Sequence, residues 1–462
     1  MRRMEPSEPP SEPGLEHPAA ARRLDRRQLL VRGGLLAGAT GIGGAAGYAL
    51  GRDDDGREAG AATAAPVEDE PEFALDPGLA NLTTFVLATH PRRVRLAIER
   101  HRAALDENPS RALLEGEPGL EDEGRAAAAS YLGAEVDDVA LTDSTTMGLG
   151  LVYGGLRLGP GDEIVTTEHD FYATHEALRL RAERDGVRVR RIRLYDHPAT
   201  ADSGRIADAV AESLTRKTRA LAVTWVHSST GVKLPLAHLA DVVAAANRGR
   251  PDAERILLCV DGVHGFGVEA ASPVELGADV FVSGCHKWLF GPRGTGIVWA
   301  APHAWERIAP TLPSFDGQAY LAWLEGRAPT GAAPARLATP GGYHSFEHRW
   351  ALAEAFAFHE ELGRDEVERR THGLAARLKD GLSGVTGVLL VTPADQALSS
   401  GLVCCDVPGT AVGEVVERLR VEHGVVASGT PYATPYLRFG PSIANDEADV
   451  DRAVEAMAAI TA

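Results

Sequence analysis

Between residues 139 and 299 the chain alternates short apolar runs with longer helical stretches, and this order constrains the fold more than any other feature. The helical stretches include residues 147–156, 171–185 and 236–246. Strands that alternate with helices favour a mainly parallel sheet covered on both faces. We therefore predict an α/β fold with a mainly parallel seven-stranded sheet. The predicted strands are 139–141, 163–167, 187–192, 220–226, 256–260, 280–283 and 296–299.

A break in composition divides the rest of the chain. Residues 326–342 are rich in Gly, Pro and Ala, and a second set of predicted elements follows them. These elements are helices at 346–362 and 367–382, strands near Val388 and Leu402, and a final helix from Glu447. Because most domains have roughly 100 to 200 residues, a chain of 462 residues is long for one domain. We predict a large domain at residues 96–325 and a smaller α+β domain from residues 73–95 and 326–462.

Composition narrows the function classes. The formal net charge of -18 makes nucleic acid a poor partner, because binding to phosphates depends on Lys and Arg. The 44% hydrophobic content supplies enough apolar surface for a sizeable core. The four cysteines do not have the spacing of a metal or redox motif, and we predict no metal site. They are Cys259, Cys285, Cys404 and Cys405, of which the last two lie in an apolar run typical of a buried strand.

The first 72 residues have the composition of a leader and linker rather than of a domain. Residues 1–20 are rich in Pro and Glu and have no apolar period, which predicts disorder. Arg26 and Arg27 then precede a Gly/Ala/Leu-rich run at residues 29–50, a layout that resembles the twin-arginine export signal. The resemblance implies the twin-arginine translocation machinery as a partner. We expect export to the periplasm or the extracellular space, with an N-terminal membrane anchor if the signal is retained.

The most informative segment covers residues 256–299. One predicted strand ends in Asp261, and the next is followed by Lys287 and a glycine-rich turn. Both residues therefore lie at the carboxyl ends of strands, where open α/β sheets bind their ligands. A lysine amine can form a Schiff base with an aldehyde, and an acid at a pyridine nitrogen keeps that ring an electron sink. A lone lysine is more often a surface residue, but Lys287 lies between His286 and Trp288 beside an apolar run.

The paired motifs Asp261-Gly262-Val263-His264 and Ser283-Gly284-Cys285-His286-Lys287-Trp288 are specific. With them the chain, from about residue 81 onward, resembles the class V aminotransferase family of fold-type I pyridoxal 5′-phosphate (PLP) enzymes. The resemblance implies PLP as the cofactor, an amino acid as the substrate and a homodimer. It also implies that Lys287 carries PLP as a Schiff base and that Asp261 pairs with the pyridine nitrogen.

Further residues match the family's cofactor and substrate positions. Thr145 and Thr146 match the phosphate loop at a helix start, where free N–H groups favour a phosphate. The resemblance implies that His169 stacks on the cofactor ring as a catalytic residue and that Arg438 binds the substrate carboxylate. The remaining implied cofactor contacts are Ser228, His264 and His286. Ser228 stands where many members have Asn, and His264 is typical of the isopenicillin N epimerase-like branch.

Several functions stay open at this point. Cysteine desulfurases need a mobile cysteine late in the chain, and residues 427–434 contain none; Ser428 also replaces that branch's carboxylate-binding arginine. Epimerisation, transamination and elimination by a lyase, including a C–S lyase, all begin with removal of the α-proton by Lys287. A second class is an exported amino-acid-binding homologue without catalysis, but Lys287 and Asp261 are intact. We expect an enzyme of the epimerase-like branch.

Overall fold

The computed structural model describes residues 70–462. The predicted export signal and most of the predicted leader lie outside these residues. Among residues 70–462, no helix combines the length and the hydrophobicity needed to cross a membrane.

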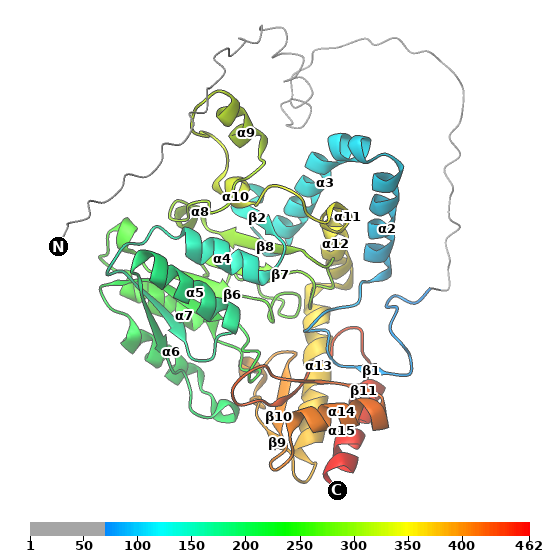
Figure 1. Cartoon of the computed structure of the whole chain (residues 1–462). Helices are drawn as coiled ribbons and strands as arrows, with labels where there is room; N and C mark the ends of the chain where they lie inside the picture. The colour runs from blue at the N-terminus through cyan, green and yellow to red at the C-terminus, as the bar shows by residue number, and fades with distance from the viewer. Residues whose placement is uncertain (1–69) are drawn as a thin grey trace, which may run out of the picture. The chain divides into compact units, whose positions relative to one another are not determined.

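A seven-stranded sheet forms the centre of the structure (Figure 1). Its order is β2-β8-β7-β6-β5-β3-β4. Strands β4, β3, β5, β6 and β7 are parallel to one another, whereas β8 is antiparallel to both β7 and β2. The predicted mainly parallel sheet of seven strands is confirmed. The bounds are β2 (Val139–Thr142), β3 (Glu163–Thr167), β4 (Arg188–Ile192), β5 (Thr218–Thr224), β6 (Leu257–Asp261), β7 (Val280–Gly284) and β8 (Gly296–Ala300).

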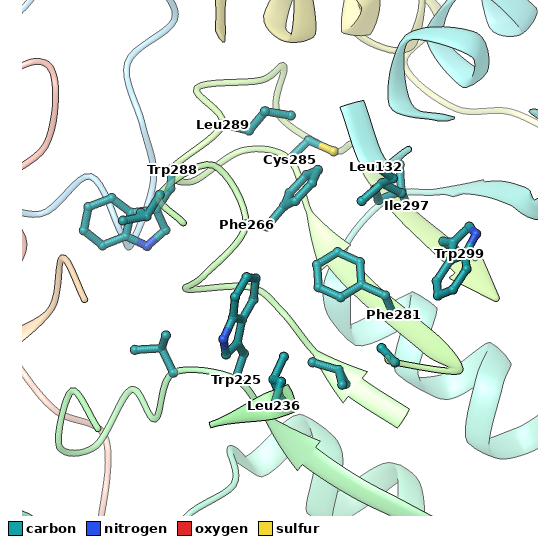
Figure 2. Close-up of a cluster of buried hydrophobic side chains, with 14 of the residues drawn as sticks. Leu132, Trp225, Leu236, Phe266, Phe281, Cys285, Trp288, Leu289, Ile297 and Trp299 are labelled. Carbon is teal, nitrogen blue, oxygen red and sulfur yellow. The ribbon is translucent and has the colours of Figure 1, made fainter. Parts of the chain in front are cut away.

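Helices cover both faces of this sheet because alternate strand residues point to opposite faces. On one face, α4 (Thr145–Gly155), α5 (Tyr172–Asp185), α8 (Pro302–Trp305) and α10 (Pro334–Ala338) enclose one apolar core. The other face packs against α3 (Pro109–Leu132), α6 (Ser203–Ser213), α7 (Leu236–Ala246) and α12 (Leu352–Leu362). Figure 2 shows the centre of this second core, where Trp225, Phe266 and Phe281 meet.

Other helices extend from these layers. Helix α2 (Arg92–Glu107) packs against α3 and against α11 (Phe346–Trp350). Helix α9 (Gly317–Leu324) lies away from the seven-stranded sheet (Figure 1). The predicted single helix at 346–362 is two helices, α11 and α12. The α-helical pattern stops at Ala351, whose N–H donates to the carbonyl of His348 three residues earlier instead of four. Short 3₁₀ turns lie at Val136–Asp138, Pro198–Thr200, Asp252–Glu254 and Gln396–Leu398.

The C-terminal part has its own sheet and core. An antiparallel sheet in the order β12-β13-β10-β9 packs against three helices and encloses a third apolar core. The strands are β9 (Leu389–Leu390), β10 (Val403–Asp406), β12 (Ser428–Gly429) and β13 (Leu437–Phe439), and the helices are α13 (Arg364–Ser383), α14 (Val412–His423) and α15 (Glu447–Thr461). β1 (Ala80–Asn81) pairs in parallel with β11 (Val425–Val426). The domain boundaries given above stay a prediction.

All four cysteines are free and buried. Cys404 and Cys405 lie in β10, as the apolar run predicts.

Candidate active site

A cavity of about 190 Å³ lies where β6 and β7 end. Asp261 is the last residue of β6, and Lys287 follows the end of β7 by three residues. Because the two strands are parallel neighbours, their carboxyl ends bring these side chains to one place. The cavity contains five of the predicted site residues. It is lined by Asp261, Lys287, Arg438, Ser228 and His264, and by Phe85, Val86, Phe171, Thr224, Val263 and Pro431.

A tight turn positions Lys287. The N–H of Phe290 donates to the carbonyl of Lys287 over 2.9 Å, and the N–H of Gly291 donates to Cys285 over 2.8 Å. Phe290 has a φ of 56°, the only positive φ of a non-glycine residue in the described part of the chain. Such a left-handed conformation costs about 1–2 kcal/mol and persists only where surrounding contacts enforce it. Here the Phe290 ring is buried against Phe73, so the turn is held in one shape.

Asp261 and Lys287 affect each other's protonation. Burial raises the pKa of the Asp261 carboxyl, although the N–H of Val263, which donates to Oδ1 over 3.1 Å, and Lys287 oppose that rise. Burial lowers the pKa of the Lys287 amine, and the nearby Arg438 cation adds to the effect while Asp261 opposes it. The neutral amine is the form that attacks a carbonyl or accepts a proton. The cavity therefore favours a reactive lysine.

His264 lies in the cavity as a neutral hydrogen-bond donor. Trp288 Nε1 donates to its Nδ1 over 3.3 Å, which leaves Nε2 to carry the ring proton. Burial holds the pKa of His264 well below its usual range, and the Lys287 and Arg438 cations lower it further. His264 can thus donate a hydrogen bond to an oxygen in the cavity without adding positive charge.

Arg438, on β13, is a buried cation held in a fixed orientation. Its Nη1 donates to the carbonyl of Ser228 over 3.0 Å, and its Nε donates to Ser428 Oγ over 3.3 Å. The guanidinium carbon lies 4.4 Å from the centroid of the Phe85 ring. No carboxylate of residues 70–462 pairs with this arginine, and its Nη2 has no protein partner among them. A guanidinium with open donors in a cavity is suited to a ligand carboxylate.

A second group of polar atoms gathers beside the start of α4. The N–H of Gly284 donates to Thr145 Oγ1 over 2.7 Å, which leaves the Thr145 hydroxyl free to donate. His286 Nδ1 is buried and has no hydrogen-bond partner within residues 70–462. A Cβ at Gly284 would lie 2.9 Å from the His286 ring and 3.1 Å from Thr145 Oγ1. The glycine thus lets Thr145 and His286 come together, while Thr146 is exposed on the first turn of α4.

The N-terminal end of α4 is fixed to the sheet. Ser144 Oγ accepts from the N–H of Met147 over 3.2 Å as the helix cap. A Cβ at Gly148 would lie 2.5 Å from Val282, so only glycine lets the helix approach β7 this closely. Arg349, buried in α11, donates from Nη2 to Asp143 over 2.8 Å and holds the loop before the cap. No local sequence signal marked this arginine as part of the site.

His169 lies outside the cavity lining. Its ring is stacked on that of Tyr195, whose hydroxyl is 2.9 Å from both His227 Nδ1 and Thr230 Oγ1. Burial lowers the pKa of His169 to about 3, so the ring is neutral. The implied stacking of His169 on a cofactor stays a prediction. Tyr195 was missed, although its position just after the carboxyl end of β4 could have marked it.

Tyr432 is the other site residue that sequence reasoning missed. Its hydroxyl is 2.6 Å from Ser228 Oγ, and its ring packs edge-on against Phe171. Burial raises the pKa of Tyr432 to about 12, so its hydroxyl keeps its proton at neutral pH. The loop at 427–434 was considered only for its lack of cysteine, and the tyrosine within it was the available signal.

A further polar cluster lies outside the cavity lining. Ligand atoms of Glu269, Glu368 and His372 come within 4.8 Å of one another. Glu269, however, already accepts from Lys233 Nζ over 2.7 Å and lies 2.8 Å from His372 Nε2. We interpret this cluster as an ion-pair network, because the lysine supplies the positive charge that a metal would otherwise bring.

Comparison with known proteins places this geometry in a family. Residues 119–452 match the family model for aminotransferase class-V. The chain is 29% identical over 399 residues to the isopenicillin N epimerase of Streptomyces clavuligerus, covering 84% of this chain and 96% of that protein. It is 27% identical to the isopenicillin N epimerase of Amycolatopsis lactamdurans, with the same two coverages. It is 25% identical to a probable cysteine desulfurase of Halalkalibacterium halodurans, covering 66% of this chain and 71% of that protein.

Solved structures share the fold. The cystine C–S lyase C-DES in complex with cysteine persulfide superposes with a TM-score of 0.72 at 22% identity, covering 82% of this chain and 97% of that one. The cysteine desulfurase CsdA of Escherichia coli superposes with a TM-score of 0.70 at 22% identity, covering 83% and 95%. The predicted fold-type I architecture is confirmed. Since the family model covers well over half of the sequence, the chain belongs to the aminotransferase class-V family of PLP-dependent enzymes.

Proposed function

We propose that this enzyme acts at the α-carbon of an amino acid and that its reaction is an epimerisation. The observation that carries the proposal is one cavity that contains Lys287, Asp261 and Arg438. These side chains supply a base, a ring-nitrogen partner and a carboxylate receptor, which α-carbon chemistry on an amino acid requires. The substrate is then a free amino acid or a larger compound that ends in an α-amino acid centre.

The residues present fit the family's cofactor. The unpartnered, buried Nδ1 of His286, the Thr145 hydroxyl and the N-terminal end of α4 offer donors for a phosphate. Asp261 would pair with the ring nitrogen, and the Nε2–H of His264 would donate to the phenolic oxygen. Ser228 also lines that part of the cavity. When bound to Lys287, PLP supplies an electron sink for the α-carbon.

Different side chains of the protein would bind the substrate and transfer the proton. Arg438 binds the substrate carboxylate with the donors that its protein contacts leave open, and so orients the α-carbon. The Lys287 amine would accept the α-proton at Nζ. Burial favours the neutral, basic form of this amine. The largely apolar wall formed by Phe85, Val263 and Phe171 limits access of water.

Two observations favour epimerisation over sulfur transfer. The loop at 427–434 presents Tyr432 and no cysteine, so it has no group that could take up a persulfide. Alignment with the two isopenicillin N epimerases covers 96% of each, whereas the H. halodurans desulfurase aligns over 71% of its length. Elimination by a lyase is the second candidate, since it needs the same lysine and no cysteine.

One experiment separates these reactions. The purified enzyme is incubated with a panel of amino acids in deuterated water, and the products are analysed by NMR and chiral chromatography. We expect α-hydrogen exchange together with inversion for at least one substrate. Ammonia and a keto acid without an amino acceptor would instead identify a lyase. A keto acid with transfer of the amine would identify an aminotransferase, and no exchange with any amino acid would favour a catalytically inactive binding protein.

We also propose that the enzyme is exported through the twin-arginine pathway and that it is a closed two-fold homodimer. Arg26, Arg27 and the weakly hydrophobic run after them support export.

Val86 lines the cavity yet is 51% exposed, and the neighbouring Leu87 is 49% exposed. Large apolar side chains at the rim of a site support a protein interface there. Sedimentation at micromolar concentration should give twice the monomer mass, and a fully active monomer would contradict the dimer.

A further inference from the structure

Tyr432 and Lys287 approach the cavity from different parts of the fold. Lys287 follows β7 of the seven-stranded sheet, whereas Tyr432 lies in the loop between β12 and β13 of the four-stranded sheet. The Tyr432 hydroxyl is 2.6 Å from Ser228 Oγ. Its ring contacts Phe171, with ring centroids 6.1 Å apart. Ser228 and Phe171 both line the cavity that contains Lys287, so the phenol group contacts two residues of the cavity wall.

We propose that Tyr432 is a second catalytic residue, which delivers a proton to the α-carbon on the face opposite to Lys287. The inference rests on the proposed epimerisation and names the group that makes inversion possible. A single base that removes and returns the proton on one face gives exchange with retention. Inversion by direct protonation requires a second donor on the other face.

In the proposed direction, Lys287 removes the α-proton and Tyr432 delivers a new one. The α-carbon–hydrogen bond breaks, its proton goes to Lys287 Nζ, and its electron pair stays on the substrate. A new carbon–hydrogen bond forms on the other face as the Tyr432 O–H bond breaks and leaves its electron pair on the phenolate oxygen. Water returns a proton to Tyr432, and Lys287 releases its proton to water. The reverse direction exchanges the roles of the two groups.

The surroundings of Tyr432 suit a proton donor. If Tyr432 donates to the substrate, its oxygen accepts the hydrogen bond from the Ser228 hydroxyl, which the 2.6 Å separation allows. Burial raises the pKa of the Tyr432 hydroxyl and lowers that of the free Lys287 amine, so a protonated phenol and a neutral amine can be present at the same pH. An acid and a base are thereby available at one pH.

Arg438 connects this donor with substrate binding. Its Nη1 donates to the carbonyl of Ser228, the residue whose hydroxyl meets Tyr432. The same guanidinium is the proposed receptor for the substrate carboxylate. One arginine therefore contacts both the proposed site of the substrate carboxylate and the residue whose hydroxyl meets the phenol.

The test compares Tyr432→Phe with Tyr436→Phe, a tyrosine of the same loop whose hydroxyl has no hydrogen-bond partner within residues 70–462. The substrate is the amino acid that the wild-type enzyme inverts. In deuterated water we expect Tyr432→Phe to keep α-hydrogen exchange with retention, while the ratio of inversion to exchange falls roughly 10²- to 10⁴-fold. Tyr436→Phe should keep the wild-type ratio. The cofactor absorbance and the urea midpoint of each variant show that the site and fold are intact.

The possible results distinguish a failure of the Tyr432 assignment from a failure of the proposed epimerisation. If the wild type inverts its substrate and Tyr432→Phe inverts it with an unchanged ratio, Tyr432 is not the donor and the epimerisation stands. If the wild type exchanges the α-hydrogen without inversion of any substrate, the epimerisation itself fails and the inference fails with it. Ser228→Ala gives a second measurement, because loss of its hydrogen bond should lower the ratio in the same direction by roughly tenfold.

Discussion

The rings of His169 and Tyr195 lie almost parallel, with 3.9 Å between their centroids and 14° between their planes. The Tyr195 hydroxyl is held by His227 and Thr230, so the tyrosine cannot rotate without loss of two hydrogen bonds. This stack fixes the plane of a neutral imidazole. It also gives His169 a rigid support on one side.

Replacement of Tyr195 by Phe should destabilise the protein while the stack is kept. The change removes the hydrogen-bond partner of His227 Nδ1, a residue whose Nε2 already lacks a partner in the described part of the chain. Leaving a buried polar group unpaired costs about 1–3 kcal/mol. Urea unfolding should show this loss, and Tyr343→Phe, at a side chain 89% exposed, should change stability by less than about 0.5 kcal/mol. Equal stability of the two variants would contradict the proposed support.

Lys287→Ala should lose covalent attachment of the cofactor. The wild type should absorb light near the boundary between the ultraviolet and the visible range. Reduction with borohydride should attach the cofactor permanently to the protein. We expect Lys217→Ala, at an exposed lysine, to behave as the wild type. Unchanged absorbance and borohydride trapping in Lys287→Ala would refute the assignment of this lysine.

Asp261→Asn should keep cofactor but lose most turnover. The amide has nearly the size of the carboxylate but not its charge, so it cannot favour a protonated ring nitrogen. Absorbance measures retention of the cofactor, and α-hydrogen exchange measures the chemistry. Near-normal exchange would show that Asp261 has another role.

Arg438→Lys should weaken substrate binding. Lysine keeps a positive charge but cannot form two parallel hydrogen bonds to a carboxylate. A hydrogen bond to a charged group contributes about 1.5–3 kcal/mol, so KM should rise roughly 10- to 150-fold. The matched control is Arg420→Lys, at an exposed arginine of α14 that pairs with Glu417. If KM is equal in both variants, the carboxylate binds elsewhere.

Buried histidines should make the protein less stable in mild acid. Burial lowers the pKa of His227 to about 3 and that of His359 to about 4, against 6.5 for an exposed histidine. Between these values the unfolded chain binds a proton that the folded chain does not, so stability falls as pH drops below about 6.5. Each such histidine contributes up to about 1.4 kcal/mol per pH unit in this window.

His359→Phe isolates one of these contributions, because the new ring carries no proton-binding nitrogen. The loss of stability between pH 7.5 and pH 5 should be about 2 kcal/mol smaller than in the wild type. Urea unfolding at both pH values measures this difference, and exposed His197→Asn should keep the wild-type pH dependence. The same loss in His359→Phe and the wild type would argue against a depressed pKa at this site.

Export should depend on Arg26 and Arg27. Changing both to Lys keeps the charge and removes the planar guanidinium groups that a receptor could bind. The double variant should then stay in the cytoplasm, as measured by fractionation and immunoblotting. Unchanged secretion would rule out the twin-arginine route.

The large sheet was predictable because most of its strands are short apolar runs that alternate with helical stretches. The predicted strand at 256–260 is β6 at Leu257–Asp261, one residue later, and the others agree as closely at most ends. The small sheet was only partly predictable. β9 and β12 have two residues each, which is too short for any periodicity to show.

The site residues also differ in how far the sequence predicted them. Asp261 and Lys287 stand in continuous motifs, so their proximity follows from two neighbouring parallel strands. Tyr432 and Arg349 reach the site only through contacts with residues far away in the sequence, Ser228 and Asp143. Nothing local distinguishes Arg349 from an ordinary structural arginine, and only its place in the loop at 427–434 distinguishes Tyr432. Tertiary packing, which a single sequence does not display, decides both.

The pairing of β1 with β11 has a consequence for the order of synthesis. Ala80 and Asn81 are translated early, but their partners Val425 and Val426 leave the ribosome several hundred residues later. Closing so long a loop is slow and must wait for nearly the whole chain. Arg438 lies in β13, twelve residues after the end of β11 at Val426, and is translated later still. Lys287 is therefore synthesised well before Arg438, the residue proposed to bind the substrate carboxylate.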